Sequence, residues 1–458
     1  MRSHALLLLV LAAAAAGRAE TYDIGADFAK SEGWTRAGAA FVAEHRDSGF
    51  RFLEKGREDA ARAPRSGGVT FHGLEVYESR LWFATSGVAR IELSLYNRGD
   101  ADRPLTAADL GEKLAAVRRL FDAAGAKSPR VEAQNVGNGV QQFRQTWRSP
   151  APAQLVWRGR KVAGGRVDAD FVRVTLLPPG GMDAGAQGFA VKARARGKAA
   201  IRENVVKVTA ATAEEGRTKD GDVFVGNVPM VDQGDKGYCA VATCERVLRY
   251  YGLAVDEHEL GASAGSTASG GTSLQAMYET VSALAKKFGL GTHLVYGELD
   301  KDVGGRIHDL EKQVADYNKA AKKLRRPEIA RSQYVRGGVM WDAAAAQAAM
   351  EPVVLKAMKL KLPAFRVFQR ALHDQVNAGI PLVWSVTLGI FPEPDIPQAQ
   401  GGHMRLIIGY NDRTKEIIYT DSWGAGHECK HMPLDDAWAI SKAVLFIKPN
   451  RFIKPNRK

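Results

Sequence analysis

The sequence contains very little cysteine. Its 458 residues include only Cys239, Cys244 and Cys429, so a hydrophobic core rather than a disulfide framework must stabilise the fold. Long hydrophobic runs are also missing, because no segment reaches the roughly 18 consecutive apolar residues that indicate a membrane-spanning helix. Aromatic residues make up only 8% of the chain and are not interleaved with basic residues, as they are in stacking platforms for nucleic acid. We therefore expect a soluble globular protein that binds no nucleic acid.

The overall composition is that of an ordinary globular protein. Hydrophobic residues account for 45% and charged residues for 25%, which excludes a mostly disordered chain. Lysine and arginine outnumber aspartate and glutamate by 64 to 51, and this net charge of +13 favours acidic partners or anionic surfaces without identifying one. At about 150 residues per domain, the length predicts two or three domains.

Residues 1–19 have the pattern of a secretory signal peptide. A short basic start is followed by an apolar run over residues 5–16, and small residues lie at Gly17 and Ala19. The run is too short for the roughly 20 residues that span a bilayer, and no cysteine follows it to carry a lipid anchor. We expect cleavage near Ala19 and a mature protein that is secreted or periplasmic, without a transmembrane segment.

Residues 20–185 predict a separate α+β domain. Alternating apolar and polar residues over 91–95 and 172–176 are typical of half-buried strands. Between them, apolar residues recur at helical spacing after Thr106, a candidate N-cap. The segments on either side of residues 149–152 predict a hairpin with a long loop. No group of chemically reactive residues occurs in this domain, so its sequence does not indicate its role.

Two further boundaries follow from local composition. Residues 186–222 are polar, basic at their start and rich in small side chains, which predicts a linker to a second domain over residues 223–447. Within that domain, residues 301–370 predict a helical insertion with fifteen basic against seven acidic residues. This charge fits either a solvated helical surface or a docking surface for an acidic substrate or an anionic cell envelope. Residues 448–458 predict a basic tail.

The segment around Cys239 carries the most informative chemical pattern. Apolar residues at helical spacing predict a helix that starts at about Cys239 and stops at Gly252. At a helix N-terminus the helix dipole favours a thiolate, and the free backbone N–H groups can hold a developing oxyanion. Gln233, six residues earlier, could supply a second N–H donor. The alternative is a buried and inert cysteine.

A second pattern predicts a β-hairpin with polar side chains at one end. Its strands cover residues 404–410 and 416–420, so we expect His403 and Asp421 to lie beside each other where the hairpin opens. A carboxylate beside an imidazole fixes its tautomer and favours its charged form. Taken singly, His403 could cap the hairpin and Asp421 could form an Asx turn. Their occurrence together with Cys239 favours a nucleophilic catalytic site.

These segments resemble papain-like cysteine peptidases. VDQGDKGYC is similar to the loop that leads from glutamine to cysteine in that family, GGHMRLIIGY to its histidine strand and TDSWG to its Asn-Ser-Trp-Gly segment. The segments AVATCERVLRYYG, GGTS and NAGIPLVWSV resemble more closely the bacterial branch related to bacteriocin-processing peptidases. The resemblance spans roughly residues 225–447, interrupted by the insertion, and does not reach the N-terminal domain.

The resemblance implies a papain-like fold in which an N-terminal helix bears the cysteine and an antiparallel sheet bears the histidine and the aspartate. The implied roles are nucleophile for Cys239, acid and base for His403, orienting carboxylate for Asp421, oxyanion hole for Gln233, and shielding of the His–Asp contact from water for Trp423. Papain has asparagine at the Asp421 position, although aspartate occurs in the bacterial branch, and its Cys-Gly-Ser-Cys-Trp segment is absent here. These departures concern the substrate pockets more than the triad.

The sequence as a whole predicts an exported bacterial cysteine peptidase. It would hydrolyse peptide bonds of peptide or protein substrates through a thioester intermediate, with no metal or organic cofactor. Two alternatives stay open: an amidase or transamidase that acts on cell-wall peptides with the same triad, and a non-catalytic binding protein on this fold. The N-terminal domain is either an inhibitory pro-region or an accessory module.

The sequence leaves two alternatives for the other two cysteines. Cys244 and Cys429 are either a disulfide pair or two free thiols, because sequence cannot measure the distance between them. The segment HECKH over residues 427–431 does not match the common ligand spacings of zinc, so we expect no metal site there.

Overall fold

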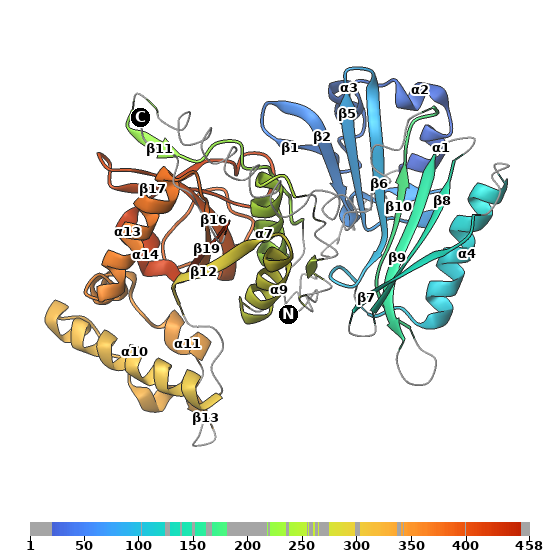
Figure 1. The fold of residues 1–458 in the computed structure, drawn as a ribbon. Helices are drawn as coiled ribbons and strands as arrows, with labels where there is room; N and C mark the ends of the chain where they lie inside the picture. Colours follow the sequence, from blue (N-terminus) through green and yellow to red (C-terminus); the bar gives the residue numbers. More distant parts are fainter. Residues whose placement is uncertain are drawn as a thin grey trace, which may run out of the picture.

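The computed structural model describes residues 21–449, apart from residues 102, 124–128, 138–139, 149–151, 162–166, 181–217, 219, 235–237, 254, 256–259, 262–263, 265–273, 298–302, 337–339, 342 and 399. Within this range the chain forms two large antiparallel sheets, each with helices packed against it, and Figure 1 shows the two parts side by side. The predicted mixture of helices and strands is thereby confirmed. The predicted signal peptide and most of the predicted linker and basic tail lie outside the described residues.

The N-terminal part, residues 21–180, contains the first sheet. Its eight strands run in the order β1-β2-β5-β6-β10-β9-β8-β7, and every neighbouring pair is antiparallel. The strands are β1 (Arg51–Glu54), β2 (Arg57–Pro64), β5 (Glu78–Ala84), β6 (Gly87–Asn97), β7 (Glu132–Gly137), β8 (Val140–Trp147), β9 (Ala153–Lys161) and β10 (Val167–Leu176). The other elements are α1 (Ile24–Phe28), α2 (Ser31–Trp34), α3 (Gly38–Glu44), the 3₁₀ turn η1 (Arg65–Gly67), the hairpin β3 (Thr70–Phe71) and β4 (Leu74–Glu75), and α4 (Ala107–Ala123).

The helix predicted after Thr106 is α4, and its start is a reciprocal cap. The Asp109 backbone N–H donates to Thr106 Oγ1 at 3.1 Å, while the Thr106 N–H donates to Asp109 Oδ2 at 3.0 Å. Leu110, Leu114 and Val117 are buried in the core of the first sheet, as helical spacing requires. The two predicted strands lie within β6 and β10, and the predicted hairpin is the pair β8 and β9.

The C-terminal part, residues 218–449, contains the second sheet. Six strands follow the order β12-β19-β15-β16-β17-β18, and β11 pairs with β16. The strands are β11 (Asp222–Phe224), β12 (Leu290–Tyr296), β15 (Leu382–Leu388), β16 (Gly401–Asn411), β17 (Glu416–Thr420), β18 (Lys430–Pro433) and β19 (Ser441–Pro449). The helices that pack with this sheet are α7 (Cys239–Tyr250), α9 (Leu274–Lys287), α13 (Pro363–Asn377) and α14 (Leu434–Ile440). Figure 1 shows α7 on the side of this part that faces the first sheet.

Each large sheet has its own hydrophobic core, and a smaller core lies in the predicted insertion. The small core is formed mainly by α10 (Val303–Leu324) and α12 (Pro352–Lys359), with contributions from η3 (Arg331–Tyr334) and α11 (Ala343–Ala348). The short hairpin of β13 (Val335–Arg336) and β14 (Met340–Trp341) lies between η3 and α11 in the chain. Helix α13 begins within the predicted insertion but buries Phe368 and Leu372 in the core of the second sheet. Among the described residues, none of these helices, and no other, is both long and apolar enough to cross a bilayer.

Candidate active site

The helix that carries Cys239 is held by its apolar face. Val241, Val247 and Leu248 are fully buried in the core of the second sheet, so α7 is packed along its whole length. Cys239 is the first residue of the helix and remains partly exposed, whereas the interior thiol of Cys244 is buried. The helix starts where the sequence predicts it, which places the thiol beside the N–H groups of the first turn.

His403 and Asp421 meet beside the hairpin as predicted. His403 lies in β16, and Asp421 is the residue that follows β17. The distance between His403 Nε2 and Asp421 Oδ1 is 2.9 Å, and both side chains are completely buried. A charge-assisted hydrogen bond in such a dry site is stronger than the same bond in water.

The register of the hairpin differs from the simple prediction. A bulge between Ile407 and Gly409 shifts the pairing, so that Leu406 faces Thr420 and the next residues in line are Arg405 and Asp421. His403 lies two residues beyond Arg405 on the same face of the strand and reaches Asp421 diagonally.

Arg405 is the main site residue that the sequence analysis missed. Its Nε donates to Asp421 Oδ1 at 2.9 Å, and its Nη1 lies 2.8 Å from Glu393 Oε2, with the arginine side chain fully buried. The Tyr419 hydroxyl also donates to Glu393 Oε2, at 2.8 Å. The signal in the sequence was the alternation His403-Met404-Arg405, which places both cations on one face of the strand.

The charges in this cluster set the protonation of its members. Burial raises the pKa of Asp421, but the hydrogen bond from His403 and the Arg405 charge outweigh it and leave that pKa below its ordinary value. Burial favours neutral His403, but its interactions with Asp421 and Cys239 raise the pKa of the imidazole above its ordinary value. The site therefore favours an imidazolium beside a carboxylate.

The same interactions indicate which ring nitrogen serves the thiol. Asp421 occupies Nε2 of His403, while Nδ1 has no hydrogen-bond partner among the described residues. Cys239 is close enough to His403 to raise its pKa. Nδ1 is therefore the ring nitrogen left to exchange a proton with the Cys239 sulfur.

Gln233 is anchored to the segment that follows Asp421. The Gln233 backbone N–H donates to the Ser422 carbonyl oxygen at 2.7 Å, and the Ser422 hydroxyl donates to Gln233 Oε1 at 2.7 Å. Gln233 is 4% exposed. Ser422, which the sequence analysis did not single out, thus fixes both the backbone and the amide of the glutamine.

Trp423 lies flat on the imidazole. Its ring is stacked on that of His403, with a centroid distance of 4.1 Å and an angle of 9° between the planes. The indole therefore covers one face of the ring that Asp421 orients, and the position agrees with the shielding role that the resemblance implies.

A second missed residue, Arg246, links α7 to the histidine hairpin. Its guanidinium donates to the backbone oxygens of Pro229 at 2.8 Å and Asp421 at 2.7 Å, and to Thr420 Oγ1 at 2.7 Å. Burial lowers the pKa of Arg246 to about 10, so the group is still charged at neutral pH. The helix that begins at Cys239 is thereby tied to the residue that orients His403.

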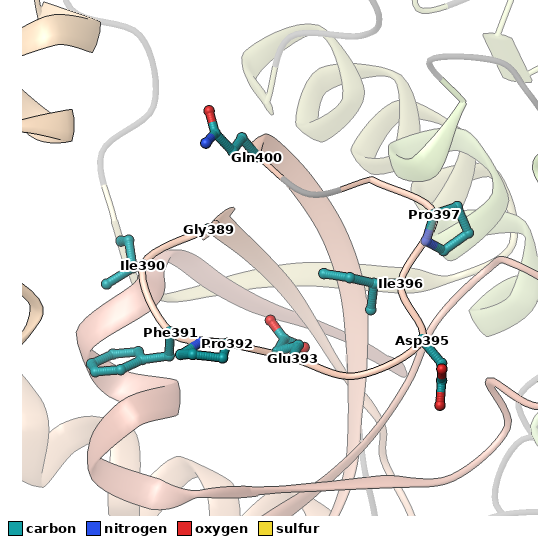
Figure 2. A pocket seen from close by; sticks show the side chains of 9 residues that line it. All are labelled: Gly389, Ile390, Phe391, Pro392, Glu393, Asp395, Ile396, Pro397 and Gln400. Carbon is teal, nitrogen blue, oxygen red and sulfur yellow. The ribbon is translucent and has the colours of Figure 1, made fainter.

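A pocket of about 600 Å³ lies in the loop that precedes β16. It is lined by Gly389, Ile390, Phe391, Pro392, Glu393, Asp395, Ile396, Pro397 and Gln400. Figure 2 shows the side chains of Glu393 and Ile396 pointing into the loop, whereas Asp395 points away. Glu393 is already paired with Arg405, so its charge is not free to attract a basic ligand.

The other sequence alternatives can be placed as well. All three cysteines are free thiols, with Cys244 buried and Cys429 exposed, so the disulfide alternative is not realised. Within the described ranges, no group of three or more histidine, cysteine or acidic side chains is arranged to hold a metal ion.

One family model matches part of the chain. Residues 342–444 match the model of the Peptidase_C39 like family. This match confirms the resemblance to papain-like peptidases of the bacteriocin-processing type and supports a cysteine-type peptidase. The matched range includes His403, Asp421 and Trp423, but not Cys239 or Gln233.

Comparisons with individual proteins add little. A double glycine motif protease from an AMS/PCAT transporter, in complex with the leader peptide, is 14% identical, with a TM-score of 0.24 over 50% of this chain and 95% of that chain. Xylellain, a cysteine protease from Xylella fastidiosa, is 13% identical, with a TM-score of 0.25 over 54% of this chain and 89% of that chain. These scores are too low to carry an argument, and no curated protein matches the chain.

Proposed function

We propose that the chain is a cysteine peptidase in which Cys239, His403 and Asp421 form a catalytic triad. The observation that carries the proposal is the buried 2.9 Å contact between His403 Nε2 and Asp421 Oδ1, beside a partly exposed cysteine at the start of α7. The family match over residues 342–444 supports the same chemistry. A histidine that pairs with a carboxylate through one ring nitrogen and lies close to a cysteine is the arrangement that a nucleophilic triad requires.

In the first half of the reaction, His403 accepts the Cys239 proton and the thiolate attacks the carbonyl carbon of the scissile amide. The developing oxyanion accepts hydrogen bonds from the Cys239 backbone N–H and the Gln233 amide. When the tetrahedral intermediate collapses, the C–N bond breaks and His403 gives its proton to the leaving amine. The product is a thioester between Cys239 and the acyl part of the substrate.

In the second half, water replaces the amine. His403 removes a proton from the water molecule, which attacks the thioester carbonyl carbon. When this tetrahedral intermediate collapses, the C–S bond breaks, the acyl part leaves as a carboxylic acid, and the same imidazole returns a proton to the Cys239 sulfur. Asp421 holds the ring in one tautomer throughout, and Trp423 keeps water from the hydrogen bond between them. No metal or organic cofactor takes part in these steps.

The decisive test replaces the nucleophile. Cys239→Ala should lower the hydrolysis of a peptide library by several orders of magnitude, because the covalent route is lost. Cys429→Ala is the matched control, since that thiol is exposed and lies outside the proposed site; it should retain full activity. Hydrolysis that persists in Cys239→Ala would refute the assignment of the nucleophile.

The substrate class can be separated in the same experiment. Casein-like proteins, short peptides and purified peptidoglycan are digested in parallel, and free amines and acyl-transfer products are quantified. Hydrolysis of proteins or short peptides is the expected result. Release of wall peptides alone, or transfer of the acyl group to an added amine, would assign the triad to cell-wall amidase or transamidase chemistry instead.

We also propose that the chain is exported after cleavage near Ala19. Support comes from the apolar run over residues 5–16 and the small residues before the cleavage position. N-terminal sequencing of the protein recovered from the medium or the periplasm should begin at Glu20. Recovery of the intact N-terminus from the cytoplasm would contradict the proposal.

A further inference from the structure

We infer that the N-terminal part is a positioning element of the proposed catalytic centre: Asn97 and Arg62 hold Tyr238 and Asp232, the residues that directly precede Cys239 and Gln233. The inference rests on the proposed function for its meaning, but the contacts behind it are independent of that function. They come from the first sheet, which the family match does not reach. The role differs from both an inhibitory pro-region and a separate accessory module.

The first contact fixes the residue before the nucleophile. The Tyr238 hydroxyl donates to Asn97 Oδ1 at 2.9 Å, and both residues are almost completely buried. Asn97 ends β6, and its own side chain is set by the following turn, where the Gly99 N–H donates to Oδ1 at 3.2 Å and Nδ2 donates to Asp100 at 3.0 Å. The acceptor that Tyr238 meets is therefore preorganised.

The space around this hydroxyl is fully used. A Cβ added at Gly99 would lie 2.0 Å from the Tyr238 hydroxyl oxygen, far inside any real contact. The Tyr238 ring itself belongs to the core of the second sheet. Tyr238 thus joins the two parts: its ring packs in the core of the second sheet, and its hydroxyl is enclosed beside Asn97 and Gly99 of the N-terminal part.

The second contact lies on the other side of Gln233. Arg62 Nη1 lies 3.4 Å from Asp232 Oδ2, and Arg62 Nε is paired with buried Glu78. Asp232 Oδ1 accepts the backbone N–H of Gly234 at 2.8 Å, so the aspartate also shapes the turn after the glutamine. A Cβ at Gly234 would lie 2.0 Å from Arg62 Nη2, which shows how closely the guanidinium packs against the loop.

A third contact lies earlier in the chain. The Met230 N–H donates to Glu54 Oε1 at 3.1 Å, at the end of β1. The N-terminal part therefore holds the loop at Met230, Asp232 and Tyr238, while Ser422 holds Gln233 from the other side. Arg62, Glu78 and Asn97 are buried. Burying such polar groups is costly unless each is paired, so these contacts specify a loop geometry rather than a generic packing surface.

An inhibitory pro-region would act differently. Such a region fills the substrate cleft and covers the nucleophile, whereas Cys239 remains partly exposed here. The contacts described above instead involve Tyr238 and Asp232. The His403–Asp421 pair is held by the second sheet.

The test compares two hydroxyl deletions in the full-length protein, one at each end of α7: Tyr238 directly precedes the helix, and Tyr250 is its last residue. Tyr238→Phe removes the bond to Asn97 and keeps the ring in the core. Tyr250→Phe, at the other end of α7, removes a buried bond of similar length, 2.8 Å to the Gly379 carbonyl oxygen. The two variants should lose similar thermal stability, so a difference in thiol reactivity or turnover reports on position rather than on folding.

The readouts are alkylation of Cys239 by iodoacetamide, with exposed Cys429 as the internal standard, and kcat on the peptide library. Tyr238→Phe should slow Cys239 alkylation at pH 6 and lower kcat, each by about three- to tenfold, the scale of one net hydrogen bond. KM should change little. Gly99→Ala places a methyl group where the Tyr238 hydroxyl lies, so it should lower kcat on the order of 100-fold. Gly111→Ala is its control, because that glycine faces open space.

The outcomes separate the inference from the function on which it rests. Equal alkylation rates for Tyr238→Phe and Tyr250→Phe would overturn the inference, whatever the wild type hydrolyses. Slower alkylation in Tyr238→Phe, with no hydrolysis by the wild type of any substrate, would uphold the positioning role and refute the peptidase. Because alkylation needs no substrate, the inference can be tested even if the preferred peptide is not in the library.

Discussion

Arg405 allows a quantitative prediction from a single substitution. Its side chain is fully buried and lies within 2.9 Å of Asp421 and 2.8 Å of Glu393. Arg405→Met keeps much of the apolar volume but removes the cation that buried Asp421 and Glu393 share, and leaves Asp421 with His403 alone. Removing one partner of a buried ion pair costs about 3–5 kcal/mol. At about 2–4 °C per kcal/mol for a unit of this size, the melting temperature should fall by roughly 6–20 °C.

The same substitution should disturb the site chemistry. The Arg405 charge holds the pKa of Asp421 down, so its loss moves that pKa upward and weakens the carboxylate that orients His403. Differential scanning fluorimetry measures the thermal stability, and kcat/KM as a function of pH measures the protonation of the site. Arg326→Met is the matched control, because Arg326 is 54% exposed and pairs with Glu351 at 3.6 Å. Exposed pairs of this kind contribute about 0–1 kcal/mol.

A second substitution tests the cause. Adding Glu393→Gln to Arg405→Met removes the buried charge that has lost its cation and leaves an acceptor for the Tyr419 hydroxyl, so it should restore part of the lost stability. If Arg405→Met lowers the melting temperature no more than Arg326→Met does, the buried cluster is not the stabilising contact described here and the reasoning fails.

Three further outcomes follow from the protonation of buried groups. Asp421→Asn should shift the alkaline limb of kcat/KM to lower pH, because Asp421 raises the pKa of His403 and the imidazolium is lost sooner without it; an unchanged limb would contradict the pairing. Burial and the Lys442 charge lower the pKa of Lys359 to about 7. The free-energy cost of burying the charged side chain is therefore fully present below pH 7, and it shrinks as the pH rises toward about 10.4, the pKa of lysine in unfolded chains. The melting temperature of Lys359→Met minus that of the wild type should therefore decrease between pH 6 and pH 9, and a constant difference would argue against a buried cation. Burial raises the pKa of Cys244 to about 12, so iodoacetamide at pH 7 should modify Cys239 and Cys429 in the folded protein but leave Cys244 intact until urea unfolds it.

The local parts of the fold could be predicted from the sequence because short-range patterns determine them. The reciprocal cap at Thr106 and the helix start at Cys239 depend on neighbouring residues only. The proximity of His403 and Asp421 followed from one hairpin, and the structure has that contact.

The missed residues share a different property. Arg405 meets Asp421 only because a bulge near Ile408 changes the strand register, and nothing in the residue pattern announces that bulge. Arg62 and Asn97 belong to the first sheet and contact Asp232 and Tyr238, on either side of Gln233 in the chain. Such long-range contacts depend on how the two sheets pack together. The sequence assigned no chemical role to the N-terminal part, because it contains no group of chemically reactive residues.

The wide spacing of these contacts along the chain has a consequence for the timing of folding. Arg246 bonds to Asp421 across 175 residues, and Tyr238 bonds to Asn97 across 141 residues. Contacts that close such long loops form late, after local helices and hairpins. In a growing chain, the proposed triad of Cys239, His403 and Asp421 therefore cannot assemble until residue 421 has been synthesised. The proposed peptidase would thereby be unable to cleave its own unfinished polypeptide, as a consequence of the topology.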